Sequence, residues 1–360
     1  MTTLRRRLTT AAALAAASAL VLSACGSGGS SDADTIKIVG FAVPEAANKA
    51  IAEKFEETPE GKGVSFKTSY GASGDQSRAV ADGLPADYVH LSVATDVDRL
   101  VDAGLVDKTW DDGPNQGIVS TSVVVLGVRK GNPKNIQGWD DLVKPGVKIV
   151  TANPASSGAA RWNALAAWGS VTSQGGSDAE ATAYVDKLFT NVVSLTNSGR
   201  DATQSFLGGT GDVLLAYENE SILANQNGQG FDYVIPDTTV LIENPGAVLK
   251  KHVPATEPWL DFVLGTTGQR EFALKGFRPL NEEQPGVADL SAVGLKASDI
   301  KGAAAASDPF PQVETLLTLA DDFGGHDWSG VKDKLFGDGK DGAPVGIVTE
   351  AIAKSGKASQ

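Results

Sequence analysis

The feature that most constrains the fold is an alternation of β-branched runs with amphipathic stretches, which begins near Thr35. Ile36 to Val39 predicts a buried strand, and Pro44 to Phe55 predicts a helix with proline in its first turn. Repetition of strand and helix is typical of an α/β chain with mainly parallel sheets. Further strands are expected over 64–69, 88–93, 122–128 and 148–151, and further helices from Ser73, over 97–103 and over 157–168.

Length, charge and cysteine content narrow the class of protein. A chain of 360 residues exceeds one ordinary hydrophobic core, so two lobes are expected. A formal net charge of −13 lacks the basic surface that nucleic-acid binding requires. A single cysteine excludes an internal disulfide, and His90, His252 and His326 have no metal-ligand spacing. The sequence therefore predicts no metal, no cofactor and no nucleic-acid partner.

The N-terminus predicts export and lipid attachment. A basic run at 5–7 precedes the apolar stretch from Ala11 to Leu22, which is shorter than the roughly 20 residues of a spanning helix. The sequence LSAC at 22–25 matches a bacterial lipobox, so residues 1–24 are expected to be a signal peptide and Cys25 the lipidated residue. Two acyl chains suffice for stable anchoring, and residues 25–34 provide a flexible tether.

Enzyme motifs are few. The chain has no GxSxG elbow, Walker A loop or GxGxxG fingerprint. SxxK at 298–301 has no accompanying KTG, and GGTG at 208–211 precedes an apolar strand, which predicts a turn. The chain is therefore not expected to be an enzyme. A secreted hydrolase with Ser73 or Ser157 as nucleophile stays open as an alternative, because triads assemble in space rather than in sequence.

Several predicted strand-to-helix junctions carry small residues with many hydrogen-bond donors. Such junctions occur at Ser73-Gly74, Ser157-Gly158-Ala159, Ser198-Gly199 and Val43-Pro44. Backbone N–H groups in a first helical turn lack intrahelical partners and lie at the positive end of the helix dipole, so they bind anions. Ser73 with Gln76 also fits a capping box. These junctions are candidate anion-binding sites.

Longer motifs resemble one family. They are YGASGDQ at 70–76, VRKGNPK at 128–134, WDDLVKPGV at 139–147, NPASSGAARWN at 153–163 and GDVLLAYENE at 211–220. This set is similar to the sulfate/thiosulfate-binding proteins of bacterial ABC importers. The likeness is continuous from Thr35 to Pro279 and looser beyond it. It implies a periplasmic-binding-protein fold, in which two α/β lobes joined by two crossovers close over a ligand in the interlobe cleft.

The resemblance also implies a site built from uncharged donors. Ser73 would supply its amide from one lobe, and a further amide would come from Ala42 or Val43, whose register is open by one residue. The other lobe would supply the Ser157 hydroxyl and further backbone amides. Tyr217 stands where many members have a tryptophan, so its contact with the anion is open. Arg200 would brace local carbonyl groups. The remaining expected amide donors are Gly158, Ala159 and Gly199.

The expected organisation follows from the same resemblance. Lobe 1 would comprise residues 35–119 and 236–285, lobe 2 residues 120–235, and residues 286–360 would pack on both lobes. The chain would be a monomeric, lipid-anchored receptor on the outer face of the cell membrane. It would deliver sulfate or thiosulfate to ABC permease and ATPase subunits. A receptor of the same architecture for molybdate, tungstate or phosphate is the closest alternative.

Overall fold

The computed structural model describes residues 35–324, 328–340 and 342–357. The predicted signal peptide, Cys25 and the tether lie outside these ranges. Within them, no helix is both long enough and apolar enough to cross a membrane.

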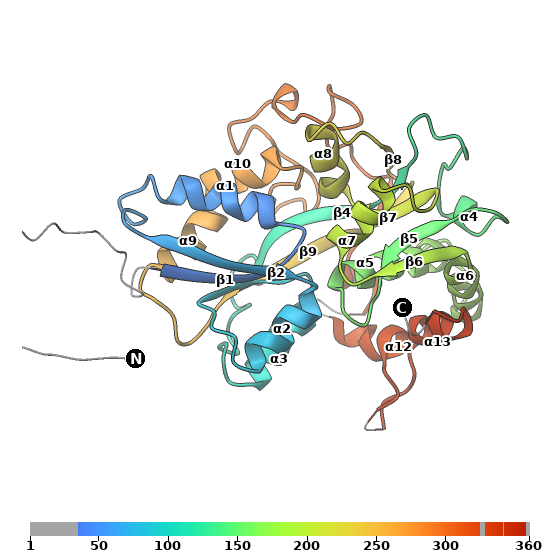
Figure 1. Cartoon of the computed structure of the whole chain (residues 1–360), viewed down its shortest axis with the longest axis horizontal. Helices are drawn as coiled ribbons and strands as arrows, with labels where there is room; N and C mark the ends of the chain where they lie inside the picture. Colours follow the sequence, from blue (N-terminus) through green and yellow to red (C-terminus); the bar gives the residue numbers. More distant parts are fainter. Residues whose placement is uncertain (1–34, 325–327, 341, 358–360) are drawn as a thin grey trace, which may run out of the picture.

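The described strands form one sheet that runs through the whole molecule (Figure 1). Its strand order is β2-β1-β3-β9-β4-β7-β5-β6, with β10 paired to β9 and β8 paired to β4. The strands are β1 (Thr35–Phe41), β2 (Ser65–Gly71), β3 (Tyr88–His90), β4 (Ile118–Val128), β5 (Ile149–Ala152), β6 (Val192–Thr196), β7 (Val213–Tyr217), β8 (Asp232–Val234), β9 (Thr238–Val248) and β10 (Thr315–Leu317).

Helices follow most of the strands, as the alternation in the sequence predicts. The helices of the first 226 residues are α1 (Glu45–Phe55), α2 (Ser73–Ala81), α3 (Ala94–Asp102), α4 (Trp139–Leu142), α5 (Gly158–Thr172), α6 (Asp178–Asn191), α7 (Gly199–Leu207) and α8 (Glu218–Gln226). The later ones are α9 (Thr256–Leu264), α10 (Thr266–Leu274), α11 (Leu319–Asp322), α12 (Lys332–Phe336) and α13 (Ile347–Lys354), with short 3₁₀ turns at Ala297–Asp299 and Trp328–Gly330.

Two long strands join the two ends of the sheet. β4 pairs with β9 over residues 118–123 and with β7 over residues 124–128. β9 continues to pair with β3 at its far end. All of these pairings are antiparallel. The expected parallel pairing occurs at the sheet ends, where β1 pairs with β2 and β3, and β5 with β6 and β7, and also between β10 and β9. A local periodicity cannot reveal that β4 and β9 reverse direction in the middle of the sheet.

Helices cover the sheet end that contains β1 on both faces. Figure 1 shows α1 and α10 on one side of β1 and β2, and α2 with α3 on the other. β1 is accordingly buried along its length except at Lys37, which is partly exposed. This burial explains why the sequence of β1 is nearly continuously apolar instead of alternating between apolar and polar residues. The strand that the sequence predicts over 88–93 is shorter in the structure, where β3 ends at His90.

The C-terminal part of the chain packs against α5 and α6. Trp328 meets Trp162 of α5 edge to face, with ring centroids 4.6 Å apart. Lys354 of α13 pairs with Asp186 of α6 at 3.2 Å. Figure 1 shows α12 and α13 beside α6, in agreement with these contacts.

Candidate functional site

The beginnings of several helices meet at the middle of the molecule. A Cβ atom built on Gly199, the first residue of α7, would lie 3.1 Å from the Cβ of Ala159 in α5. The same atom would lie 3.4 Å from Val43 Cγ2, just before α1. The backbone N–H of Gly74 in α2 donates to the carbonyl oxygen of Ser156, just before α5, at 3.0 Å. The structure thus brings together four junctions that the sequence singled out separately.

Five backbone amides at these junctions have no protein acceptor in the described part of the chain. Within the described residues, the N–H groups of these five junction residues donate no hydrogen bond. Four of these five residues are buried, and unpaired buried amides are rare in native proteins. Helix dipoles add positive potential at these ends, so an anion is the expected occupant. The positions are Val43, Ser73, Gly158, Ala159 and Gly199.

Ala42 and Val43 differ in the state of their amides. The N–H of Ala42 donates to the carbonyl oxygen of Gly71 at 2.9 Å, which continues the pairing of β1 with β2. Val43 follows the end of β1, and its N–H has no acceptor in the described part of the chain. Of the two candidates, Val43 is the one with an amide free for a ligand.

Ser157 caps α5, as its sequence position predicts. Its side-chain oxygen accepts a hydrogen bond from the N–H of Ala160 at 3.4 Å. The residue is buried, and no acceptor for its hydroxyl proton occurs among the described residues. The Ser157 hydroxyl is therefore able to donate beside the amides of Gly158 and Ala159. Ser198 caps α7 in the same way, with Asp201 as the donor at 3.1 Å.

The predicted capping box of Ser73 and Gln76 is wrong. Ala72 occupies the cap position of α2, and Ser73 is the first helical residue. The Ser73 hydroxyl donates to Asp96 Oδ2 at 2.6 Å and accepts from the N–H of Ser92 at 2.9 Å. These tertiary partners replace the local cap. They occupy the Ser73 hydroxyl and leave its amide unpaired.

Tyr217 is buried at the end of β7, beside Phe41. Its hydroxyl oxygen lies 2.8 Å from Ser92 Oγ and 3.3 Å from Asn244 Nδ2. Burial raises the pKa of the Tyr217 phenol above its ordinary value, with smaller lowering effects from Ser92 and Asn244. The phenol therefore keeps its proton at neutral pH and acts as a hydroxyl donor or acceptor.

Arg200 braces the site instead of presenting a free charge. Its guanidinium forms two hydrogen bonds with the buried carboxylate of Glu220, at 3.0 and 2.7 Å. It also donates to the carbonyl oxygen of Val43 at 3.1 Å. The expected contact of Arg200 with a carbonyl group is present, although its partner is 157 residues away in the sequence, and its role beside a bound anion stays a prediction. This contact holds the Val43 peptide next to the start of α7.

Sequence reasoning missed three residues beside the site. Ser92 contacts Ser73 and Tyr217, Asp96 accepts from Ser73, and Asn244 donates to Tyr217. The sequence contained a signal for Ser92, because this residue lies between a strand and a helix, as the other junction residues do. The sequence contained no such signal for Asn244, because this residue lies within β9 and is 152 residues from Ser92, whose carbonyl oxygen it contacts.

Hydrogen bonds join the two sides of the site. Besides the contact between Gly74 and Ser156, Asn197 Nδ2 donates to Asp75 Oδ2 at 2.9 Å. Arg161 donates to Thr95 Oγ1 at 3.2 Å. These pairs link α2 and α3 with the segments before α5 and α7.

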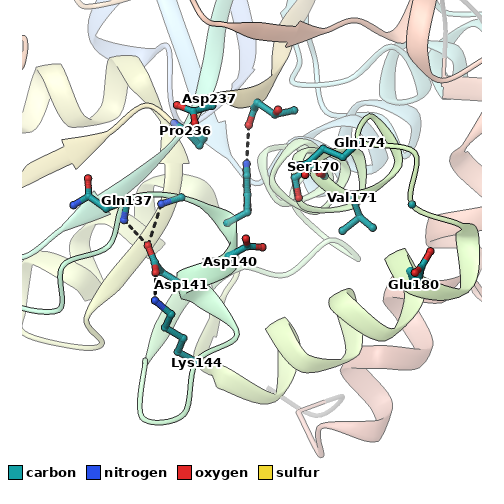
Figure 2. Close-up of a pocket in the computed structure, with 14 residues that line it drawn as sticks. Gln137, Asp140, Asp141, Lys144, Ser170, Val171, Gln174, Glu180, Pro236 and Asp237 are labelled. Carbon is teal, nitrogen blue, oxygen red and sulfur yellow. Dashed lines mark hydrogen bonds and ion pairs between the residues drawn. The ribbon is translucent and has the colours of Figure 1, made fainter.

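A separate pocket of about 660 Å³ lies between α4, the α5–α6 connection and the segment before β9 (Figure 2). None of the predicted site residues lines it. Asp141 accepts from the N–H groups of Gln137 and Gly138 and pairs with Lys144, and Trp139 donates to Thr238. Asp140, Glu180 and Asp237 add further carboxylates to its lining. This acidic pocket is unsuited to an anion.

Groups for catalysis or metal binding do not gather at the site. Neither Ser73 nor Ser157 has a histidine among its hydrogen-bond partners in the described residues. No group of three or more His, Cys, Asp or Glu able to hold a metal ion occurs in residues 35–324, 328–340 and 342–357. The site is therefore rich in donors and has no described nucleophile–base pair.

The fold and the convergent helix ends define a solute-binding protein of the periplasmic-binding-protein type. The sequence profile described as "Bacterial extracellular solute-binding protein" matches residues 36–278, and the chain belongs to this family. Members of this family bind solutes and are not enzymes, in agreement with the expectation from the sequence.

Several relatives are similar in sequence over most of the chain. The sulfate-binding protein of Synechococcus elongatus is 41% identical, covering 89% of this chain and 90% of the relative. The thiosulfate-binding protein of Pseudomonas aeruginosa is 37% identical, covering 80% and 83% respectively. The solved structure of the sulfate-binding protein SubI from Mycobacterium tuberculosis H37Rv is 41% identical, with a TM-score of 0.75, and covers 84% of this chain and 99% of that one.

Proposed function

We propose that this protein is the extracytoplasmic receptor of an ABC importer for sulfate, with thiosulfate as a second ligand. The observation that carries the proposal is the convergence of unpaired amides from Val43, Ser73, Gly158, Ala159 and Gly199. The similarity to relatives described as sulfate-binding and thiosulfate-binding proteins supports the same ligands.

The proposed site holds a dianion with neutral donors. The five amides and the Ser157 hydroxyl donate to the sulfate oxygens, and the dipoles of α2, α5 and α7 stabilise the charge. The nearby guanidinium of Arg200 is engaged by Glu220 and Val43. Fixed amide donors avoid the desolvation cost of a buried ion pair. A chain with a net charge of −13 has no long-range attraction for sulfate, so these local groups supply it.

Binding is coupled to closure of two lobes in this proposal. Residues 35–119 and 236–285 form lobe 1, and residues 120–235 form lobe 2, with β4 and β9 as the crossovers between them. β4 pairs with β7 of one sheet end, and its partner β9 pairs with β3 of the other, which supports this division. Closure brings the amides of both lobes to the anion and excludes water.

Delivery requires that the receptor stay near the membrane. Lipidation of Cys25 anchors the protein to the outer face of the cell membrane, and residues 26–34 let the folded part reach the permease and ATPase complex. The lipobox at 22–25 supports this part of the proposal. The receptor acts as a monomer.

Titration calorimetry of the purified protein tests the ligand. The panel comprises sulfate, thiosulfate, molybdate, tungstate and phosphate in one buffer, together with Ser157→Ala. We expect saturable binding of sulfate, weakened by about ten- to a hundred-fold in Ser157→Ala because a hydrogen bond to a charged group is lost. Tighter binding of molybdate or tungstate than of sulfate would reassign the receptor to that oxyanion, and no binding within the panel would overturn the proposal.

A further inference from the structure

Ser92 is fixed in position by contacts to groups on three sides. It follows β3, is fully buried, and donates its backbone N–H to Ser73 Oγ at 2.9 Å. Its carbonyl oxygen accepts from Trp162 Nε1 at 2.8 Å and from Asn244 Nδ2 at 3.0 Å. The backbone of Ser92 therefore has defined partners for both of its polar groups.

The side chain of Ser92 packs against the first residue of α5. A Cβ atom built on Gly158 would lie 2.7 Å from Ser92 Oγ, so this oxygen lies directly against the first residue of α5. The N–H of Gly158 is one of the amides without an acceptor in the described residues. The Ser92 hydroxyl thus lies next to a residue whose amide is unpaired.

The hydroxyl protons of Ser92 and Tyr217 can be assigned from their partners. A carbonyl oxygen only accepts, so the contact of Asn244 with the Ser92 carbonyl identifies that atom of Asn244 as the amide nitrogen. The same nitrogen lies 3.3 Å from Tyr217 Oη, which therefore accepts a hydrogen bond there. One bond at 2.8 Å joins the two hydroxyl groups, and it consumes only one of their two protons.

The remaining proton belongs to Ser92. A phenol is more acidic than an aliphatic alcohol, so Tyr217 is the better donor and Ser92 the better acceptor in their bond. The hydrogen bond from Asn244 to Tyr217 polarises the phenol and strengthens it further as a donor. With Tyr217 donating to Ser92, the Ser92 proton is left without an acceptor among the described residues, next to Gly158.

We infer that the Ser92 hydroxyl donates a hydrogen bond to the bound oxyanion, and that Tyr217 and Asn244 act as positioning residues that orient it. This inference rests on the proposed function and deepens it. It also accounts for the tyrosine at position 217. Asn244 donates to Tyr217, Tyr217 donates to Ser92, and Ser92 donates to the ligand. This chain supplies a side-chain donor where many family members have the indole of a tryptophan.

A double-mutant cycle in titration calorimetry with sulfate tests the chain of donors. In Ser92→Ala we expect affinity to fall by about ten- to a hundred-fold, as for a lost hydrogen bond to a charged group. Tyr217→Phe removes a neutral hydrogen bond, for which a loss of about two- to tenfold is expected. The double variant should bind as Ser92→Ala does, because Tyr217 acts only through Ser92.

The same cycle can overturn the inference. A loss in Tyr217→Phe equal to or greater than that in Ser92→Ala would make Tyr217 the direct donor. Additive losses in the double variant would give both hydroxyls independent contacts and would also contradict the chain. Ser170→Ala is the matched control, because this buried serine donates to Ala167 in α5 and should leave sulfate affinity unchanged.

Two further measurements separate a binding role from a structural one. Ser92→Ala leaves the proton of the buried Tyr217 hydroxyl unpaired, so the thermal midpoint of the ligand-free variant should fall by only a few degrees and unfolding should stay cooperative. Ser92→Gly should lose the same affinity. Failure of the wild type to bind any oxyanion would refute the proposed function. Binding by the wild type that Ser157→Ala weakens and both Ser92 variants leave intact would refute only this inference.

Discussion

Asn197 and Asp75, 122 residues apart in the sequence, are joined by a hydrogen bond of 2.9 Å between α2 and the segment before α7. The other carboxylate oxygen of Asp75 accepts from Arg78 of the same helix. Both oxygens of this acid, which follows the proposed amide donor at Ser73 by two residues, are therefore occupied by protein donors. Asp75 is thus engaged by protein donors instead of being held as an acceptor for a bound ligand.

This occupancy predicts that the protein rejects phosphate at neutral pH. The O–H of HPO₄²⁻ needs an acceptor, and a site of donors alone leaves it unpaired at a cost of about 1–3 kcal/mol. We expect sulfate to bind more than about tenfold tighter than phosphate in the same calorimetric buffer. Asp75→Asn should leave this preference unchanged. Phosphate affinity within tenfold of that for sulfate would contradict the donor-only site.

A second prediction concerns the space at Gly158. A Cβ atom there would lie 2.6 Å from Ser92 Cβ, so Gly158→Ala forces Ser92 or the start of α5 to move. Overpacking of this kind typically costs about 1–3 kcal/mol, and we expect sulfate affinity to fall by more than about tenfold. Gly113→Ala is the control, because a Cβ atom at Gly113 meets nothing within 4 Å. Equal affinities of the two variants would argue against close packing at the site.

Membrane attachment is predicted to depend on Cys25. Cys25→Ser removes the thiol that carries the lipid and leaves the folded part of the chain unchanged. The variant should bind sulfate like the wild type but appear in the soluble fraction when cells are fractionated. Recovery of Cys25→Ser in the membrane pellet would refute the lipid anchor and leave the binding site unaffected.

Sequence reasoning succeeded where the decisive interaction is local. Ser157 caps α5 through Ala160, three residues away, and short-range capping chemistry was sufficient to predict this helix start. It failed where a distant partner competes with a local one. Ser73 bonds to Asp96 and Ser92 instead of capping α2, and the bond between Ser92 and Tyr217 spans 125 residues. The reversal of β4 and β9 has the same origin, because strand direction depends on pairing between distant segments.

The last prediction concerns buried His90, whose ring nitrogens lie 3.2 Å from Asn48 Oδ1 and 3.1 Å from Ser120 Oγ. Burial lowers the pKa of His90 from 6.5 to about 3. Below pH 6.5 the unfolded chain therefore takes up a proton that the folded chain does not. Stability from this group is present above pH 6.5 and is lost progressively as the pH falls toward 3.

At pH 5 the expected loss of stability from His90 is about 2 kcal/mol relative to pH 7. Urea unfolding of the ligand-free protein at both pH values measures it, with His90→Gln as the variant that cannot be protonated. Burial raises the pKa of Glu243 to about 7, which gives a contribution of opposite sign, but this is common to both proteins and cancels in the comparison. The free energy of unfolding should fall further in the wild type than in His90→Gln. Equal losses in the two proteins would show that the folded state accepts the proton on His90 at pH 5.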